Sequence, residues 1–436
     1  MRQIRIGSAF AGAAALALAL AACTTTTTTV VKNGGGSPAS STAAAAKASP
    51  TPSGPAVTIT PGGGDKTADP STGITVTADG GTLTNVTVAT SGDKVAGAYS
   101  AGRTSWHSAM TLDVSQSYTV TAVATAADGA TTTKTSAFKT LTPSSTFAAE
   151  IFEGENQTYG VGMPIMLTFS HPITDKAAVE RSIELTTSKR VVGAWYWDGN
   201  STLDFRPRDF WPANTTVSFT GRFNGVQGAP GTYGDHTLTQ SFRIGQSVIA
   251  VASTRTHRTQ IYIGGKLTYN WPISTGRGTE PTVDGSYLTV DKNNPVRMIG
   301  GGKKGSPGYY NELVNWAVRF TFSGDYYHSA PWSVVDQGTT NVSHGCVNLA
   351  PPDAVIYYKL AVPGDPITIT GSPRSGRWDD GWTEWFLTWN QLVSGSALHE
   401  AVVAGPQGST FVPPSSVGAS TAKAPIGVAL AGSNLG

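Results

Sequence analysis

The chain has 436 residues, and its 30 Lys and Arg nearly balance its 28 Asp and Glu, so the formal net charge is only +2. This balance excludes a dedicated nucleic-acid-binding protein, which would carry a basic excess. With 51 Gly, 26 Pro and abundant Thr and Val, the composition predicts a mainly β, secreted protein with many turns.

The N-terminus has the pattern of an export signal. Arg2 and Arg5 precede an apolar run over residues 6–22 that is too short to span a bilayer comfortably. The run ends in Leu20-Ala21-Ala22-Cys23, which resembles the lipobox of bacterial lipoproteins and implies cleavage before Cys23 and acylation of its sulfur. We therefore expect a signal peptide at 1–22 and a lipid anchor in the cell membrane, facing the cell wall. An uncleaved membrane anchor is the alternative.

Two β domains are expected after this signal. Residues 23–55 are rich in Thr, Gly, Ser, Ala and Pro and predict a disordered tether, because they cannot bury enough apolar surface to fold. Short alternating runs with turn signals then predict immunoglobulin-like β-sandwiches at 56–142 and 147–246. Tyr118, which opens one run, resembles an immunoglobulin tyrosine corner. These domains are expected to act as a stalk through the wall or as plain spacers.

Residues 247–372 have longer strand patterns, and they contain the chemically informative stretch Ser343-His344-Gly345-Cys346-Val347-Asn348. Fourteen residues separate this stretch from His328, enough for a loop that lets two strands meet side by side. Cys346 is the only thiol in the exported part. It needs a neighbouring base to become a thiolate at neutral pH, and an imidazole is the usual supplier. A short helix is expected at 353–360, after two prolines.

The pattern H-x14-S-H-G-C-x-N resembles the catalytic segment of an L,D-transpeptidase of the YkuD type, a cysteine enzyme of bacterial cell-wall cross-linking. The resemblance implies a small mixed β-barrel catalytic domain with a short C-terminal helix. By this resemblance Cys346 is the nucleophile and His328 the general base, oriented by the Ser329 carbonyl. The backbone N–H groups of Gly345 and Cys346 would form an oxyanion hole, with help from the Tyr310 hydroxyl; a packing role for Tyr310 is the alternative.

Other residues near the motif have weaker assignments. Ser343, His344 and Asn348 are assigned to substrate positioning or to holding the loop. A zinc site of His328, His344 and Cys346 lacks the close-spaced ligand pairs of known zinc sites, so no metal or organic cofactor is expected. If the segment before His328 is extended, Asp325 points away from the His328 face and is a poor candidate for a triad carboxylate.

Two further segments flank the catalytic residues. Residues 291–312 predict a mobile flap whose Lys303 and Lys304 face acidic groups of the wall peptide, or else a solvated loop. Residues 373–400 are expected to form a clasp, because the tryptophans in it have spacings of four, three and four and would share one helical face. Packing is the expected role of this stripe, with carbohydrate stacking as the alternative. The four tryptophans of the clasp are Trp378, Trp382, Trp385 and Trp389.

Residues 401–436 are expected to be a disordered tail.

The resemblance implies a peptidoglycan L,D-transpeptidase. Cys346 would attack the bond between a diamino acid and D-Ala in a tetrapeptide stem, release D-Ala and pass the acyl group to a neighbouring stem amine, forming a 3→3 cross-link. The implied partners are peptidoglycan stem peptides, the membrane through Cys23, and carbapenem-class β-lactams as inhibitors. A sortase-like transpeptidase would need an arginine on a strand beside the cysteine, and Arg374 and Arg377 fall past the last predicted strand. A wall-binding lipoprotein is the non-enzyme alternative.

Overall fold

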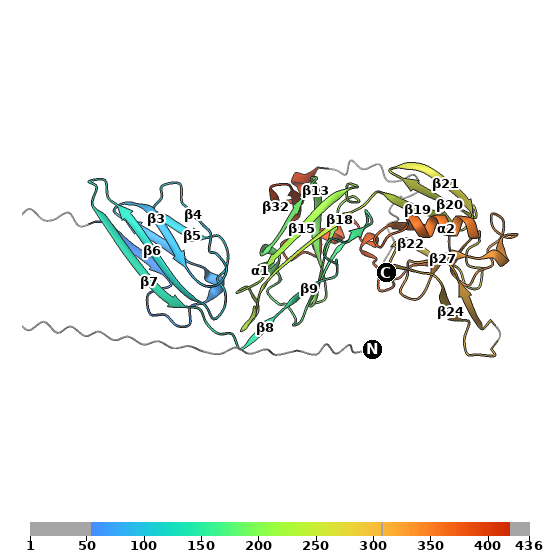
Figure 1. Ribbon diagram of the computed structural model, residues 1–436, viewed down its shortest axis with the longest axis horizontal. Coiled ribbons are helices and arrows are strands. Elements are labelled where there is room, and N and C mark those ends of the chain that lie inside the picture. The colour runs from blue at the N-terminus through green and yellow to red at the C-terminus, as the bar shows by residue number, and fades with distance from the viewer. Residues whose placement is uncertain (1–53, 307, 419–436) are drawn as a thin grey trace, which may run out of the picture. The chain divides into compact units, whose positions relative to one another are not determined.

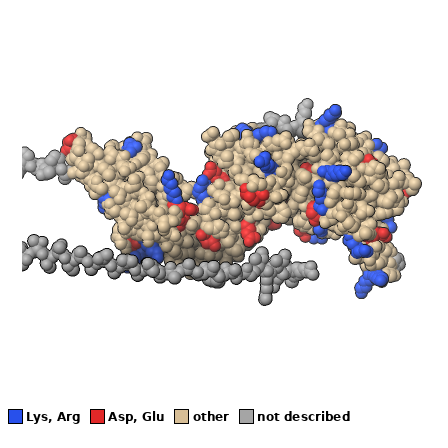
Figure 2. All heavy atoms as spheres, viewed as in Figure 1, with Lys and Arg blue, Asp and Glu red and all other residues tan. Residues whose placement is uncertain are grey.

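The computed structural model describes residues 54–306 and 308–418, which form three parts in order along the chain (Figure 1). The expected signal peptide, Cys23 and residues 23–53 of the expected tether lie outside the described residues. None of the helices described is both long and apolar enough to cross a membrane. On the face drawn in Figure 2, positive and negative side chains are interspersed over a mostly uncharged surface.

The first part, residues 54–142, has two sheets around one apolar core, with strand orders β1-β2-β5-β4 and β3-β6-β7. Alternation along β6 buries Tyr118, Val120 and Ala122 on one face. The Tyr118 hydroxyl accepts a hydrogen bond from the Asp113 N–H at 2.8 Å, the contact that defines a tyrosine corner. The strands are β1 (Ala56–Thr60), β2 (Thr75–Asp79), β3 (Thr82–Ala89), β4 (Gly97–Tyr99), β5 (Ser105–Ser108), β6 (Ser117–Thr125) and β7 (Thr131–Lys139).

The second part is built on one ten-stranded sheet in the order β10-β18-β15-β12-β31-β13-β14-β11-β9, with β32 paired to β31. The sheet curls, since β9 and β18 lie near opposite ends of this order and still contact each other. Its inner face holds large apolar side chains such as Trp195, Phe205 and Phe219 in one core. The elements before residue 246 are β8 (Ser145–Phe147), β9 (Ala149–Ile151), β10 (Thr158–Tyr159), β11 (Ile165–Phe169), α1 (Lys176–Arg181), β12 (Ile183–Thr187), β13 (Val191–Asp198), β14 (Thr202–Pro207), β15 (Thr215–Arg222), β16 (Gln227–Ala229), β17 (Thr232–Gly234) and β18 (Thr237–Ile244).

The expected disordered tail from residue 401 is wrong for residues 401–418. β31 (Ala401–Gly405) lies between β12 and β13, and β32 (Gly408–Val412) pairs antiparallel with β31 along its full length. Val402 and Ala404 of β31 are buried in the core of the second part. β31 is short and has small side chains, so its sequence has little strand pattern of its own. It forms a strand because it pairs with strands about 200 residues earlier in the chain. The second part is therefore completed by the C-terminal segment, and residues 419–436 lie outside the described range.

The third part contains two sheets, ordered β21-β20-β19-β29-β22-β30 and β23-β26-β27-β28, and a β24-β25 hairpin. The catalytic motif lies on and before β27 and β28. The helix α2 (Pro351–Leu360) begins two residues before its predicted start, because proline suits the first helical turn. The fold is mainly β, as predicted. The strands are β19 (Val248–Ser253), β20 (Arg258–Ile263), β21 (Lys266–Pro272), β22 (Val283–Leu288), β23 (Asp291–Asn293), β24 (Val296–Gly300), β25 (Tyr310–Val314), β26 (Ala317–Arg319), β27 (Tyr326–Ser329), β28 (Val347–Leu349), β29 (Pro366–Thr370) and β30 (Arg374–Ser375).

The four C-terminal tryptophans do not share one helical face, so that prediction is wrong. Only the short η3 (Glu384–Phe386) and α3 (Trp389–Ser394) are helical in this segment. Gly381 has a φ of 135°, and the neighbouring Asp380 carboxylate accepts hydrogen bonds from the Ser323 N–H and hydroxyl, which holds the preceding turn against the catalytic part. The packing role is nevertheless realised: Trp382 and Trp385 enter the core of the second part, and Trp378 and Trp389 pack in a smaller cluster with Leu392.

Charged side chains are buried beneath this clasp. Arg206 of β14 lies with its guanidinium 4.4 Å from the centroid of the Trp385 ring and donates to the Leu387 carbonyl. Burial raises the pKa of Glu384 to about 7, against the opposing effect of Arg206. The clasp and the second part are thus joined by a stacked cation and buried carboxyl groups as well as by apolar contacts.

We predict that Val402→Asp unfolds the second part, because it places an unpaired charge in the core beside the central strands. The expected loss is more than about 4 kcal/mol of unfolding free energy, measured by chemical denaturation. Thr410→Asp, on an exposed position of β32, is the matched control and is expected to change stability by less than about 0.5 kcal/mol. Equal stability of the two variants would contradict the placement of β31.

Candidate active site

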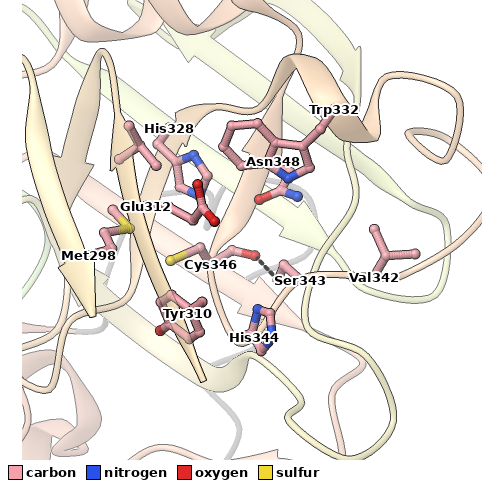
Figure 3. Close-up of a pocket in the computed structure, with 11 residues that line it drawn as sticks. Met298, Tyr310, Glu312, His328, Trp332, Val342, Ser343, His344, Cys346 and Asn348 are labelled. Atoms are coloured by element: carbon pink, nitrogen blue, oxygen red, sulfur yellow. Dashed lines mark hydrogen bonds between the residues drawn. The ribbon is translucent and has the colours of Figure 1, made fainter. Parts of the chain in front are cut away.

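A cavity of about 440 Å³ opens beside the catalytic motif (Figure 3). It lies between the flap hairpin, which we define as β24, β25 and the turn that joins them, and the segments around β27 and β28. Both predicted catalytic side chains, His328 and Cys346, are in its wall. The lining residues are Met298, Tyr310, Glu312, Val314, His328, Trp332, Val342, Ser343, His344, Cys346 and Asn348.

Strand pairing brings the two parts of the motif together. β27 and β28 are parallel neighbours, and His328 is in register with Asn348. Parallel neighbours need a long connection, which the segment between Ser329 and Val347 supplies. Cys346 is the residue just before β28, so the imidazole and the thiol reach the same cavity.

His328 is held in a defined tautomer. Its side chain is buried, with 4% exposure, and its Nδ1 donates a hydrogen bond to the Ser329 carbonyl at 3.0 Å. Because a carbonyl can only accept, Nδ1 carries the proton and Nε2 keeps a free lone pair. Burial lowers the pKa of His328 to about 4, since it disfavours the imidazolium. The Ser329 contact has the geometry expected from the motif.

Cys346 is the one free cysteine of the described residues. Burial raises the pKa of its thiol to about 12, and the nearby Asp325 carboxylate adds to the effect. Its sulfur also lies 3.9 Å from the Gly324 carbonyl, a weak S–H donor contact. At neutral pH the site therefore pairs a thiol with a neutral imidazole. Desolvation disfavours a thiolate in the resting site.

Ser343 ties the loop before Cys346. Its hydroxyl donates to the Cys346 carbonyl at 2.6 Å and accepts from the Gly345 N–H at 3.2 Å. Gly345 has a φ of 133°, and a Cβ built on it would lie 2.5 Å from Asp325 Oδ1, so no other residue fits without a shift. Because the Gly345 N–H is already engaged, it must leave Ser343 before it can serve an oxyanion hole. That assignment remains a prediction.

The other predicted site residues divide between the cavity and its support. The Tyr310 and His344 rings are 4.5 Å apart at the cavity wall, and His344 Nε2 is 3.9 Å from the Glu280 carboxylate. Burial raises the pKa of Tyr310. Asn348 donates from Nδ2 to the Ser333 hydroxyl at 3.0 Å and so fixes the turn η2 (Pro331–Ser333) that follows β27.

Two predicted residues lie apart from the cavity. Lys303 and Lys304 are exposed in the turn between β24 and β25 and are not among the lining residues of the described chain. Their assignment to the wall peptide stays a prediction. Arg374, which a sortase-like site would require, lies in the short strand β30 and also outside the described lining residues.

Sequence reasoning missed several contributors. Glu312 follows Tyr310 by two residues on β25, so strand parity was a signal that could have found it. Asp325 is not beside His328, in agreement with the parity argument, yet it lies against Gly345 and the thiol from the other side. Met298, Val314, Trp332 and Val342 come from separate segments that only the fold brings together. No group of three or more His, Cys, Asp or Glu side chains suited to a metal ion is found in the described part.

Comparison with known proteins places this site in a family. Residues 247–369 match the L,D-transpeptidase catalytic domain, and residues 65–227 match a bacterial Ig domain. L,D-transpeptidase 2 of Mycobacterium tuberculosis is 33% identical over 331 residues, which cover 74% of this chain and 80% of that protein. L,D-transpeptidase 5 of the same organism is 33% identical over 359 residues, which cover 80% and 78%.

A solved structure of the LD transpeptidase LdtMt1 in complex with imipenem is 35% identical, with a TM-score of 0.45, over 52% of this chain and 100% of that one. The identity to these two relatives and the match to the catalytic domain confirm the family inferred from the motif. The chain belongs to the L,D-transpeptidase family and is a transpeptidase with a bacterial Ig-like region before its catalytic domain.

Proposed function

We propose that Cys346 and His328 carry out the two acyl-transfer steps of this transpeptidase on peptidoglycan stem peptides. The observation that carries the proposal is the parallel pairing of β27 and β28, because it places the thiol of Cys346 and the imidazole of His328 in the wall of one cavity. The orientation of His328 by Ser329 leaves Nε2 free to accept a proton. A thiol, a correctly oriented base and room for a peptide are the requirements of cysteine acyl transfer.

The first step begins from the neutral pair. As the Cys346 sulfur attacks the carbonyl of the diamino acid, His328 takes the thiol proton, so charge separation develops during bond formation and not before it. The carbon–nitrogen bond to D-Ala then breaks, and His328 returns the proton to the leaving amine. The product is a thioester, and D-Ala departs with a neutral or solvent-protonated amine.

The second step transfers the acyl group to the side-chain amine of a neighbouring stem. The nitrogen attacks the thioester carbon, the carbon–sulfur bond breaks, and the amine proton passes through His328 back to sulfur. The product is a 3→3 cross-link. Tyr310, at the cavity wall beside His344, is the side chain assigned to assist the carbonyl oxygen.

β-Lactams of the carbapenem class are proposed inhibitors. Their strained amide offers the thiol a carbonyl equivalent to that of the stem, and the ring-opened product has no separate leaving amine to depart. Acylation by the β-lactam therefore leaves Cys346 blocked, and the acyl group is not transferred to an acceptor amine.

Membrane attachment through an acylated Cys23 is proposed from the lipobox pattern. A lipid anchor at the start of the chain, followed by the residues before the Ig-like region, would hold the enzyme at the outer face of the membrane, where stem peptides are exposed.

We predict that the purified protein releases D-Ala from a disaccharide tetrapeptide and that Cys346→Ala abolishes release. Treatment with a carbapenem is expected to add one adduct mass to the wild type and none to Cys346→Ala, as read by intact mass spectrometry. Release of D-Ala by the alanine variant, or an adduct on another residue, would refute the assignment of the nucleophile.

Removing the charge at Asp325 is expected to lower the pKa of Cys346, because a carboxylate beside the thiol disfavours the thiolate. For Asp325→Asn we predict that iodoacetamide alkylates Cys346 about threefold to tenfold faster at pH 8, in line with a shift of up to about one pKa unit. The second-order rate is measured from pH 6 to 10. Asp380→Asn removes another buried carboxylate of the same region and serves as the matched control. A profile unchanged or displaced to higher pH in Asp325→Asn would contradict the electrostatic effect.

Cys23→Ala is expected to release the protein into the aqueous phase while it still releases D-Ala at the wild-type rate, because the proposed anchor and the catalytic site are separate. The measurement is detergent-phase partitioning combined with intact mass. The lipobox would be ruled out if the variant still partitioned into detergent and the intact mass of the wild type showed no acyl group.

A further inference from the structure

Glu312 places a carboxylate in the wall of the catalytic cavity. It is the single Asp, Glu, Lys or Arg among the described residues that line this cavity. The other polar lining groups are neutral hydroxyls, an amide, a thiol and imidazoles. The formal charge that the cavity presents to a substrate therefore comes from this side chain.

The strand β25 sets the direction of this carboxylate. Tyr310, Glu312 and Val314 alternate along it and all line the cavity, whereas Asn311 and Leu313 do not. Asn311 instead accepts a hydrogen bond from Arg297. Asn311, Glu312 and Leu313 are all exposed to solvent, and of the three Glu312 is the one that lines the cavity. Figure 3 shows the Glu312 carboxylate projecting from β25 into the cavity on the side that holds His328.

No cationic side chain neutralises this carboxylate within the described chain. Of the nearby acids, Glu280 is paired with Arg277 and approaches His344, and Asp325 accepts a hydrogen bond from the Thr321 hydroxyl. No ion pair or hydrogen bond is found for the Glu312 carboxylate among the described residues. A negative charge at this position also opposes the negative charge that develops on the attacked carbonyl oxygen. Its presence is explained if it binds a cation at another stage of the reaction.

The reaction brings one such cation to the cavity. The side-chain amine of the acceptor stem has a pKa near about 10.4, as for a lysine-type amine, so it arrives as an ammonium. A carboxylate is the usual partner for an ammonium and makes charge-assisted hydrogen bonds with it. We propose that Glu312 binds the acceptor ammonium in the thioester state and holds its nitrogen toward the carbonyl carbon on Cys346. This inference rests on the proposed function.

The proton balance of this step is complete without another co-reactant. The ammonium first loses one proton to solvent water, and its nitrogen keeps hydrogen bonds to the Glu312 oxygens. The nitrogen then forms the new bond to the acyl carbon while the carbon–sulfur bond breaks. The remaining excess proton passes to His328 and from there to the Cys346 sulfur, which restores the neutral pair.

The test separates use of the acceptor from formation of the thioester. The full-length protein is incubated with a disaccharide tetrapeptide, D-Ala is quantified, and cross-linked and hydrolysed products are measured by mass spectrometry. For Glu312→Gln we expect the ratio of cross-linked product to released D-Ala to fall about tenfold, with a matching rise in the KM for the acceptor. Glu312→Asp, which keeps the charge, is expected to recover part of the ratio.

The outer face of the same strand supplies a matched control. Leu313→Glu adds a carboxylate one residue away that does not face the cavity, and it is expected to keep the wild-type ratio. In Glu312→Gln combined with Leu313→Glu, the flap keeps its net charge and the ratio is expected to stay low. Recovery in this double variant would show a general electrostatic effect and overturn the inference.

Two further outcomes are decisive. An equal loss of D-Ala release and of cross-linking in Glu312→Gln would mean that the residue acts in acylation or folding, and the inference would be wrong. Absence of D-Ala release in the wild type, under conditions where the protein is folded, would instead refute the proposed function itself. The two failures are distinguished by the D-Ala measurement.

Discussion

The catalytic arrangement depends on the parallel pairing of β27 with β28. That pairing places His328 in register with Asn348 and brings Cys346, the residue just before β28, to the cavity that His328 lines. The connection between the two strands is held as well. Asn348 bonds Ser333 near its start, and Ser343 bonds the Gly345 N–H and the Cys346 carbonyl near its end. A change in strand register would separate His328 from Cys346, because neighbouring positions face opposite sides of a sheet.

The electrostatic state of the pair follows from the same burial. Desolvation lowers the pKa of His328 and raises that of Cys346, so both resting groups are uncharged. Proton transfer must then accompany attack. A neutral thiol is also less open to oxidation, since the thiolate is the reactive form. Two carboxylates lie near this pair: Asp325 beside the thiol, where it raises the pKa of Cys346, and Glu312 in the cavity wall.

The catalytic part is also locked to the part before it. The clasp inserts Trp382 and Trp385 into the core of the second part, and Arg206 of β14 stacks on Trp385. The chain then supplies β31 to the middle of the second part's sheet. Residues on both sides of the catalytic domain in sequence are therefore needed to build the domain that precedes it. The fold of the second part and the position of the clasp therefore depend on each other.

The sequence alone determined the features that are written locally. The spacing of His328 and Cys346 predicted the family and the pairing of two strands, alternation predicted the buried face of β6, and two prolines predicted the start of α2. It could not predict β31, because that strand has little pattern of its own and is specified by partners far away in the chain. The tryptophan spacing predicted a helix because periodicity shows which residues are apolar and how they are spaced. The backbone path of that segment was instead decided by contacts with Ser323 and with the core of the second part. The contact of Asp325 with Gly345 and the neutral state of the Cys346–His328 pair likewise emerged only in the tertiary structure, because desolvation and proximity between distant segments are properties of the packed chain.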